Sequence, residues 1–146
     1  MSIRNKAKGT RAESAAVKYL REHFPAAERR ALSGNEDRGD IAGVPETVGE
    51  VKAAERIELT RWQRETLTEM ANAGAMNAFL LVKVPYKNVA RWDFWMLAYQ
   101  LGLEDMRGKQ LEDSRWVRMD FDLGRDVLRQ LISPYGPSAP SLPTTA

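Results

Sequence analysis

A nearly continuous apolar run at residues 78–84, Ala-Phe-Leu-Leu-Val-Lys-Val, is the feature that most constrains this fold. Such a run, closed by Pro85, is typical of a strand buried on both faces, which lies inside a sheet covered by helices on each side. The 146 residues make about one domain, because single domains typically hold ~100 to 200 residues. We therefore predict an α/β fold with a central mixed β-sheet flanked by helices.

Periodicity and turn residues predict the elements around this strand. We expect helices over 10–23, 60–73 and 122–132, and strands over 29–33, 40–44, 47–53 and 116–119. Pro45-Glu46 is a turn signal, so the strands on either side of it should form an antiparallel hairpin. The bulky segment 89–101 fits either a helix or a strand. A basic arm (1–9), one domain (10–132) and a Pro-rich, mobile tail (133–146) complete the expected organisation.

Several classes of site are excluded by composition. The chain has no cysteine and one histidine, which rules out thiolate metal sites, disulfides and cysteine nucleophiles, so any metal must be held by oxygen. No apolar run approaches the ~20 residues needed to cross a bilayer, and the first residues lead into no signal-peptide core. We expect a cytoplasmic protein without membrane contact, in the host cytoplasm if it is phage-encoded.

Positive charge is concentrated at the N-terminus. Residues 1–30 hold eight basic and three acidic side chains, a balance of +5 in a chain whose net charge is +2. The basic residues at its start, Arg4, Lys6, Lys8 and Arg11, suit a polyanion such as nucleic acid, because contacts to phosphates release counterions. The alternative is a solvated, frayed terminus.

Asp40, Glu50 and Lys52 lie within thirteen residues, on the two strands of the predicted hairpin. Strand side chains alternate between faces, so Glu50 and Lys52 project together, and hairpin pairing brings Asp40 beside Glu50. Adjacent carboxylates repel, and a hard cation such as Mg²⁺ relieves this repulsion through oxygen ligands, water and a substrate phosphate. A neighbouring lysine suits phosphodiester hydrolysis, because it orients or helps to deprotonate the attacking water and offsets transition-state charge.

The same residues have plainer interpretations. Glu-x-Lys on a strand commonly forms a weak ion pair on an exposed face. Thr10 and Glu13 have the spacing of a capping box, which predicts that Glu13 caps a helix beginning near residue 10. The surrounding sequence favours a catalytic site over a surface ion pair, because a polar, glycine-flanked loop precedes Asp40 and the helix bearing Glu13 precedes both strands.

Short motifs along the first half of the chain indicate a family. They are Lys8-Gly-Thr-Arg-Ala-Glu13, Ser33-Gly34, Gly39-Asp40-Ile41, Gly49-Glu50-Val51-Lys52 and Gln63. With these motifs the chain resembles the PD-(D/E)XK nuclease superfamily and is most similar to the archaeal-type Holliday junction resolvases, including phage-encoded relatives. The resemblance covers about residues 6–84. The chain departs from the family pattern at Gly39, where proline is often found. Beyond residue 85, no part of the chain aligns with the family.

The resemblance implies a restriction-endonuclease-like core at about 10–84 with an added C-terminal segment at 85–132. Carried over by position, the implied site consists of Glu13, Ser33, Asp40, Glu50, the Val51 backbone carbonyl, Lys52 and Gln63. Asp40, Glu50 and the Val51 carbonyl would bind Mg²⁺, for which Mn²⁺ would substitute, and Glu13 would act near the metal. Lys52 would be the catalytic lysine, Ser33 would place the substrate phosphate, and the products would carry 5'-phosphate and 3'-hydroxyl ends.

Further basic residues flank the predicted site. Arg29, Arg30 and Arg38, together with Lys6, Lys8 and Arg11, are expected to form a phosphate-binding rim. Backbone contacts carry no base information, which suits an enzyme that recognises junction shape. The aromatic residues Trp92, Phe94, Trp95 and Tyr99, with Met96, are expected in the core or a subunit interface rather than as a base-stacking platform.

The sequence thus predicts a Mg²⁺-dependent endonuclease that cleaves Holliday or other branched DNA junctions. A twofold homodimer would supply the two active sites that symmetric nicking requires. Two alternatives stay open. One is a restriction-like or other DNA-processing nuclease of the same superfamily, and the other is a non-catalytic DNA-binding module.

Overall fold

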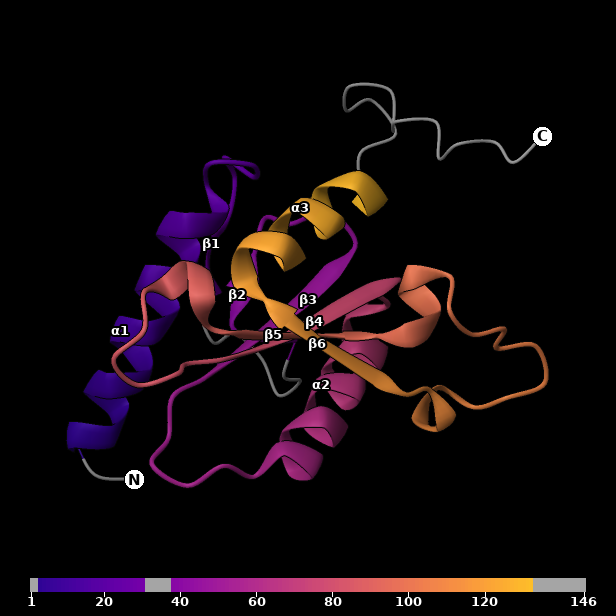
Figure 1. The fold of residues 1–146 in the computed structure, drawn as a ribbon, viewed down its shortest axis with the longest axis horizontal. Coiled ribbons are helices and arrows are strands. Elements are labelled where there is room, and N and C mark those ends of the chain that lie inside the picture. The colour runs from indigo at the N-terminus through magenta and orange to yellow at the C-terminus, as the bar shows by residue number, and fades with distance from the viewer. Residues whose placement is uncertain (1–2, 31–37, 133–146) are drawn as a thin grey trace.

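The computed structural model describes residues 3–30 and 38–132 (Figure 1). These residues form an α/β fold around a six-stranded mixed sheet, whose strands are ordered β1 to β6 as they occur in the chain. The strands are β1 (Glu28–Arg29), β2 (Ile41–Ala42), β3 (Thr47–Lys52), β4 (Asn77–Val82), β5 (Asp93–Leu97) and β6 (Trp116–Asp120). The helices are α1 (Ile3–Leu20), α2 (Leu59–Ala73) and α3 (Phe121–Ile132), with 3-10 turns at Val89–Arg91, Ala98–Leu101 and Leu111–Asp113. The predicted α/β class is confirmed.

The centre of the sheet is the parallel pair β3–β4, whose register places Lys52 opposite Val82. All the other strand pairs are antiparallel, including the predicted β2–β3 hairpin. The crossover from β3 to β4 runs through α2, as a parallel connection requires. β4 is buried along almost its whole length, which confirms the prediction made from its apolar run.

Helices cover the sheet on both faces (Figure 1). Helices α1 and α3 pack on one face, where Leu20 and Phe121 join Phe79 and Phe94 in the larger core cluster. Helix α2 covers the other face, where Trp62 packs against buried strand residues such as Leu80. Because neighbouring residues of β3 face opposite layers, Val51 enters the α1 core while Glu50 and Lys52 lie on the α2 side.

The structure corrects the predicted start of the first helix. Helix α1 begins at Ile3 rather than at residue 10, so residues 3–9 are helical and do not form an extended arm. Thr10 and Glu13 therefore lie inside the helix, and the capping-box interpretation of Glu13 is wrong. A capping side chain needs the free backbone N–H groups of a first helical turn, and here that turn is seven residues earlier.

The ambiguous segment 89–101 contains both kinds of structure, since a 3-10 turn precedes strand β5 and another follows it. Trp92, Phe94 and Met96 are buried there, which confirms the core interpretation for these three residues. Strand β1 covers Glu28–Arg29, while residues 31–33 of the predicted strand and the expected tail at 133–146 lie outside the described residues. Among the described helices, none is both long enough and apolar enough to cross a bilayer.

Candidate active site

Asp40 is held beside β3 by two backbone contacts. Its N–H donates to the Gly49 carbonyl at 2.8 Å, and its carboxylate Oδ2 accepts the Val51 N–H at 2.9 Å. The turn into it needs glycine, because Gly39 has φ +91° and a Cβ there would lie 2.9 Å from Val48. Proline, which is fixed near φ −65°, does not fit this position, so the departure from the family motif follows from the local backbone.

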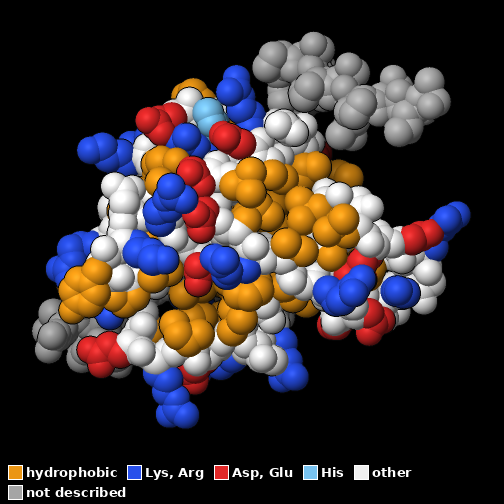
Figure 2. Space-filling model, viewed as in Figure 1, with side chains coloured by type: hydrophobic (Ala, Val, Ile, Leu, Met, Phe, Trp, Pro, Cys, Tyr) orange, Lys and Arg blue, Asp and Glu red, His pale blue; other side chains and the backbone are white. Residues whose placement is uncertain are grey.

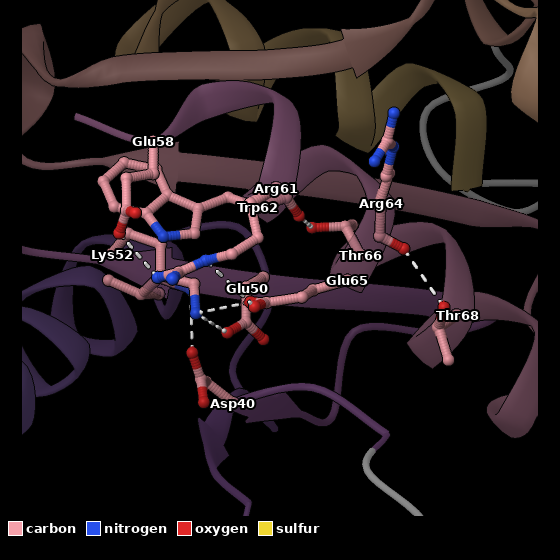
Figure 3. Close-up of polar contacts among 11 residues, drawn as sticks. Asp40, Glu50, Lys52, Glu58, Arg61, Trp62, Arg64, Glu65, Thr66 and Thr68 are labelled. Atoms are coloured by element: carbon pink, nitrogen blue, oxygen red, sulfur yellow. Dashed lines mark hydrogen bonds and ion pairs between the residues drawn. The ribbon is translucent and has the colours of Figure 1, made fainter.

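Glu50 and Lys52 project side by side from β3 toward α2 (Figure 3). The Lys52 Nζ atom lies 3.1 Å from Glu50 Oε1 and 3.0 Å from Glu65 Oε2, so one ammonium bridges two carboxylates. The Glu50 side chain is 6% exposed and that of Lys52 is 24% exposed. This pair is therefore mostly withdrawn from water, unlike the exposed surface ion pair that Glu-x-Lys usually forms.

The electrostatics of Glu50 are unfavourable for a carboxylate. Burial, the nearby charge of Asp40 and the adjacent Glu69 together raise the pKa of Glu50 far above its usual range, against the opposing effect of Lys52. Glu50 Oε2 is buried and has no hydrogen-bond partner among the described residues. Burial acts to lower the pKa of Lys52, but Glu50 and the hydrogen bond to Glu65 outweigh it and raise that pKa, so Lys52 is held as a cation.

Glu13 approaches the same site from the buried side of α1. Its side chain is 19% exposed and lies 3.5 Å from the Arg29 guanidinium. Burial and the charge of Asp40 raise the pKa of Glu13, while Arg29 and Lys52 act in the opposite direction. Of the predicted acidic residues, Glu13 and Glu50 are thus each brought within electrostatic range of Asp40.

Helix α2 supplies two acidic residues that the sequence interpretation missed. Glu65 bonds Lys52, and the buried Glu69 lies against Glu50. Glu69 follows the buried Trp62 by seven residues and therefore lies on the apolar stripe of α2. An acidic residue on that stripe is the sequence signal that could have identified Glu69 as a site residue. A hollow of about 300 Å³ opens here, lined by Glu50, Lys52, Arg61, Arg64, Glu65, Thr68 and Glu69.

Two predicted residues are not brought into this group. Gln63 lies on α2 but does not line the hollow, because it is two positions from Glu65, about 200° around the helix axis. Ser33 lies outside the described residues.

The predicted basic rim is spread over several elements. Lys6, Lys8 and Arg11 are on α1, Arg29 belongs to β1, and Arg30 and Arg38 border the segment that is not described. Arg29 is paired with Glu13, and the Arg30 N–H donates to the Asp40 carbonyl at 2.8 Å. Arg61 and Arg64 on α2, which the sequence interpretation did not select, line the same hollow as Glu50.

The oxygen atoms at this site fit a hard divalent cation. The buried Oε2 of Glu50, whose carboxyl group lies against that of Glu69, could serve as a ligand, and Asp40 is close enough to raise the pKa of Glu50. The Val51 N–H points to Asp40, so the Val51 carbonyl, which lies on the same side of the strand, faces it too. Within residues 3–30 and 38–132, no three acidic or histidine side chains already form a ligand set, so binding would require Lys52 or the carboxylates to adjust.

Comparisons with known proteins returned no match: no family model, no curated protein sequence and no solved structure is similar to this chain.

Proposed function

We propose that this chain is a divalent-metal-dependent endonuclease that hydrolyses phosphodiester bonds in DNA. The observation that carries the proposal is the convergence of Asp40, Glu50 and Lys52 at the end of β3, with the Glu50 carboxyl group buried near Asp40 and Glu69. Perturbed pKa values of buried, like-charged carboxyl groups cluster at functional sites. The motifs shared with PD-(D/E)XK nucleases contain these same three residues, and a restriction-endonuclease-like core is part of the proposal.

Asp40, Glu50 and the Val51 carbonyl would hold Mg²⁺ or Mn²⁺, with Glu13 near them. The cation would supply Lewis-acid polarisation of the phosphate and activation of a water nucleophile. Lys52 is positioned to stabilise negative charge on the phosphate, and because it is held as a cation it serves as an electrostatic group rather than as a base. Glu65, which shares Lys52 with Glu50, would keep that ammonium in place when Glu50 binds metal.

The proposed substrate is a Holliday or other branched DNA junction. Arg61 and Arg64 beside the hollow, and the basic residues of α1, are suited to contact phosphates, which position DNA without selecting sequence. The similarity to archaeal-type resolvases supports the junction, a homodimeric enzyme that nicks both strands, and a cytoplasmic location. A restriction-like or other DNA-processing nuclease of the same superfamily is the alternative within this proposal.

The test is cleavage of an end-labelled four-way junction and of a linear duplex of the same sequence, with Mg²⁺ or with a chelator. The matched variants are Glu50→Gln and, as a control, Glu112→Gln, whose side chain is exposed on the 3-10 turn Leu111–Asp113 and does not line the hollow. We expect paired nicks in the junction alone, which are lost with chelator and in Glu50→Gln but retained in Glu112→Gln.

Other results would change the proposal in defined ways. Equal cutting of the duplex would keep the nuclease and overturn the junction preference. Cleavage by Glu50→Gln at the wild-type rate would overturn the site. Binding of DNA with no cleavage in Mg²⁺ or Mn²⁺ would favour the non-catalytic DNA-binding module.

A further inference from the structure

A second hollow begins one residue beyond Lys52, where the parallel strands β3 and β4 end. It encloses about 260 Å³ and is lined by Lys8, Ala53, Ala54, Lys83, Pro85 and Tyr86. The Lys83 N–H donates to the Lys52 carbonyl at 2.9 Å, so the backbone fixes this hollow to the strand end that bears Lys52. In Figure 1 the turn between β4 and β5 passes beside the N-terminal half of α1, which explains how Lys8 reaches it.

The charge of this second hollow is positive. Lys8 and Lys83 are both half-buried, and neither has a carboxylate within 4.0 Å in the part of the chain that the structure describes. Lys83 instead lies 6.0 Å from the centre of the Trp92 ring. Other basic residues near the candidate site, such as Arg29 and Arg61, are paired with acids. Two half-buried ammonium groups without acidic partners favour an anionic ligand. In a DNA substrate, the anions next to the scissile phosphate are the neighbouring phosphates of the backbone.

Tyr86 stands at the mouth of this hollow in an unusual backbone conformation. It has φ +64°, and its side chain is completely exposed. Figure 2 shows that hydrophobic and basic side chains lie next to one another on the face of the molecule that it draws. The left-handed region is disfavoured for a bulky side chain, and such strain tends to be kept where a residue has a function. The turn is closed by the Lys87 N–H, which donates to the Val84 carbonyl. The fold therefore presents an aromatic ring to solvent beside two phosphate-binding candidates.

We propose that this second hollow binds the DNA strand next to the scissile phosphate, with Lys8 and Lys83 on backbone phosphates and Tyr86 stacked on an unpaired base. This inference rests on the proposed nuclease function and names its substrate class more closely. Every base has an aromatic face, so stacking on tyrosine accepts any sequence. A base inside a duplex is already stacked on both sides, so Tyr86 selects DNA with unpaired nucleotides beside the cut. Among branched DNAs this favours forks, flaps and single-stranded overhangs over a fully paired four-way junction.

The experiment is a binding titration in chelator, so that no cleavage occurs, using a fluorescent duplex with a single-stranded overhang and the blunt duplex of the same sequence. The variants are Tyr86→Gly, Tyr86→Phe and the double variant Lys8→Gln/Lys83→Gln. Lys109→Gln is the matched control, because Lys109 is exposed. It belongs to the loop between the 3-10 turns Ala98–Leu101 and Leu111–Asp113, and Figure 1 shows this loop at the opposite end of the molecule from the turn between β4 and β5.

We expect Tyr86→Gly to weaken overhang binding roughly tenfold while leaving blunt-duplex binding unchanged, and Tyr86→Phe to bind as the wild type does. Glycine accepts a positive φ, so Tyr86→Gly should melt at or above the wild-type temperature, which separates impaired binding from impaired folding. The lysine double variant should make the salt dependence of log K shallower by about 0.7 for each single-strand phosphate that the protein no longer neutralises. Lys109→Gln should change neither quantity.

The outcomes that overturn this inference are separate from those that overturn the nuclease. Equal affinity of wild type and Tyr86→Gly for the overhang, with metal-dependent cleavage intact, overturns the stacking site and leaves the proposed function standing. An unchanged salt dependence in the lysine variant overturns the phosphate contacts. Selective overhang binding that depends on Tyr86, in a protein that cleaves no DNA in Mg²⁺ or Mn²⁺, supports the binding site and counts against the nuclease.

Discussion

Replacing Asp40 with asparagine or with alanine separates its structural role from its proposed chemical one. Both changes remove the negative charge, which relieves the repulsion that raises the pKa values of Glu13 and Glu50. Asparagine keeps a side-chain oxygen that can accept the Val51 N–H, now bonded at 2.9 Å, whereas alanine leaves that part-buried N–H without its acceptor. Only the alanine variant should therefore lose stability.

The magnitude follows from the cost of an unsatisfied buried donor, about 1–3 kcal/mol. Because relief of repulsion is common to both variants, the difference between them isolates the hydrogen bond. We expect Asp40→Ala to be less stable than Asp40→Asn by about 1–2 kcal/mol, which lowers the melting temperature by roughly 3–6 °C for a chain of this size. Asp40→Asn should melt at or slightly above the wild-type temperature.

The assay is thermal unfolding of the three proteins in chelator, followed by junction cleavage with Mg²⁺. Neither variant should cleave, because asparagine restores the hydrogen bond but not the anionic ligand. Equal melting temperatures for Asp40→Asn and Asp40→Ala would refute the structural reasoning. Wild-type cleavage by Asp40→Asn would refute the assignment of Asp40 as a metal ligand.

Two further predictions concern β3. The pKa of Glu50 is raised in the folded state, so the folded protein binds more protons than the unfolded chain above pH 4.5, and stability in chelator should fall as pH rises from 5 to 8. Glu50→Gln should flatten that dependence, and an identical pH profile for both proteins would contradict it. Gly49→Ala should cost about 1–3 kcal/mol in urea unfolding, because a Cβ there would lie 2.3 Å from the buried Phe79 ring. A stability equal to that of the wild type would show that Phe79 moves freely.

Elements with a strong local pattern could be predicted from the sequence. The apolar run of β4, the amphipathic stripe of α2 and the turn between β2 and β3 each contain their own signal, and the structure has all three. The start of α1 could not be predicted in this way. The capping-box pattern at Thr10 and Glu13 is a local match to a motif of helix N-termini. Helix α1 nevertheless begins at Ile3, so a match to this motif does not show that a helix starts there.

The candidate site was predicted only as far as strand geometry reaches. Alternation on β3 and hairpin pairing are properties of neighbouring residues, so Asp40, Glu50 and Lys52 could be placed together. Glu65 and Glu69 join them through the packing angle of α2 on the sheet, which no short window of sequence contains. The same packing turns the opposite flank of α2, where Gln63 lies, away from the hollow.

The charge balance of the completed site argues for a ligand rather than for stability. Asp40, Glu50, Glu65 and Glu69 contribute four carboxyl groups. The cations are Lys52, which Glu50 and Glu65 share, Arg61, which pairs with Glu65, and Arg64, which lines the same hollow. Replacing buried charges with apolar groups of similar size is often neutral or stabilising, so this arrangement is a poor way to hold a helix on a sheet. Local instability of this kind persists where function requires it, and a divalent cation would supply the positive charge that the carboxylates lack. The buried carboxyl groups of Glu50 and Glu69 are thus costly as a structural arrangement, which agrees with the metal-ligand role proposed for Glu50.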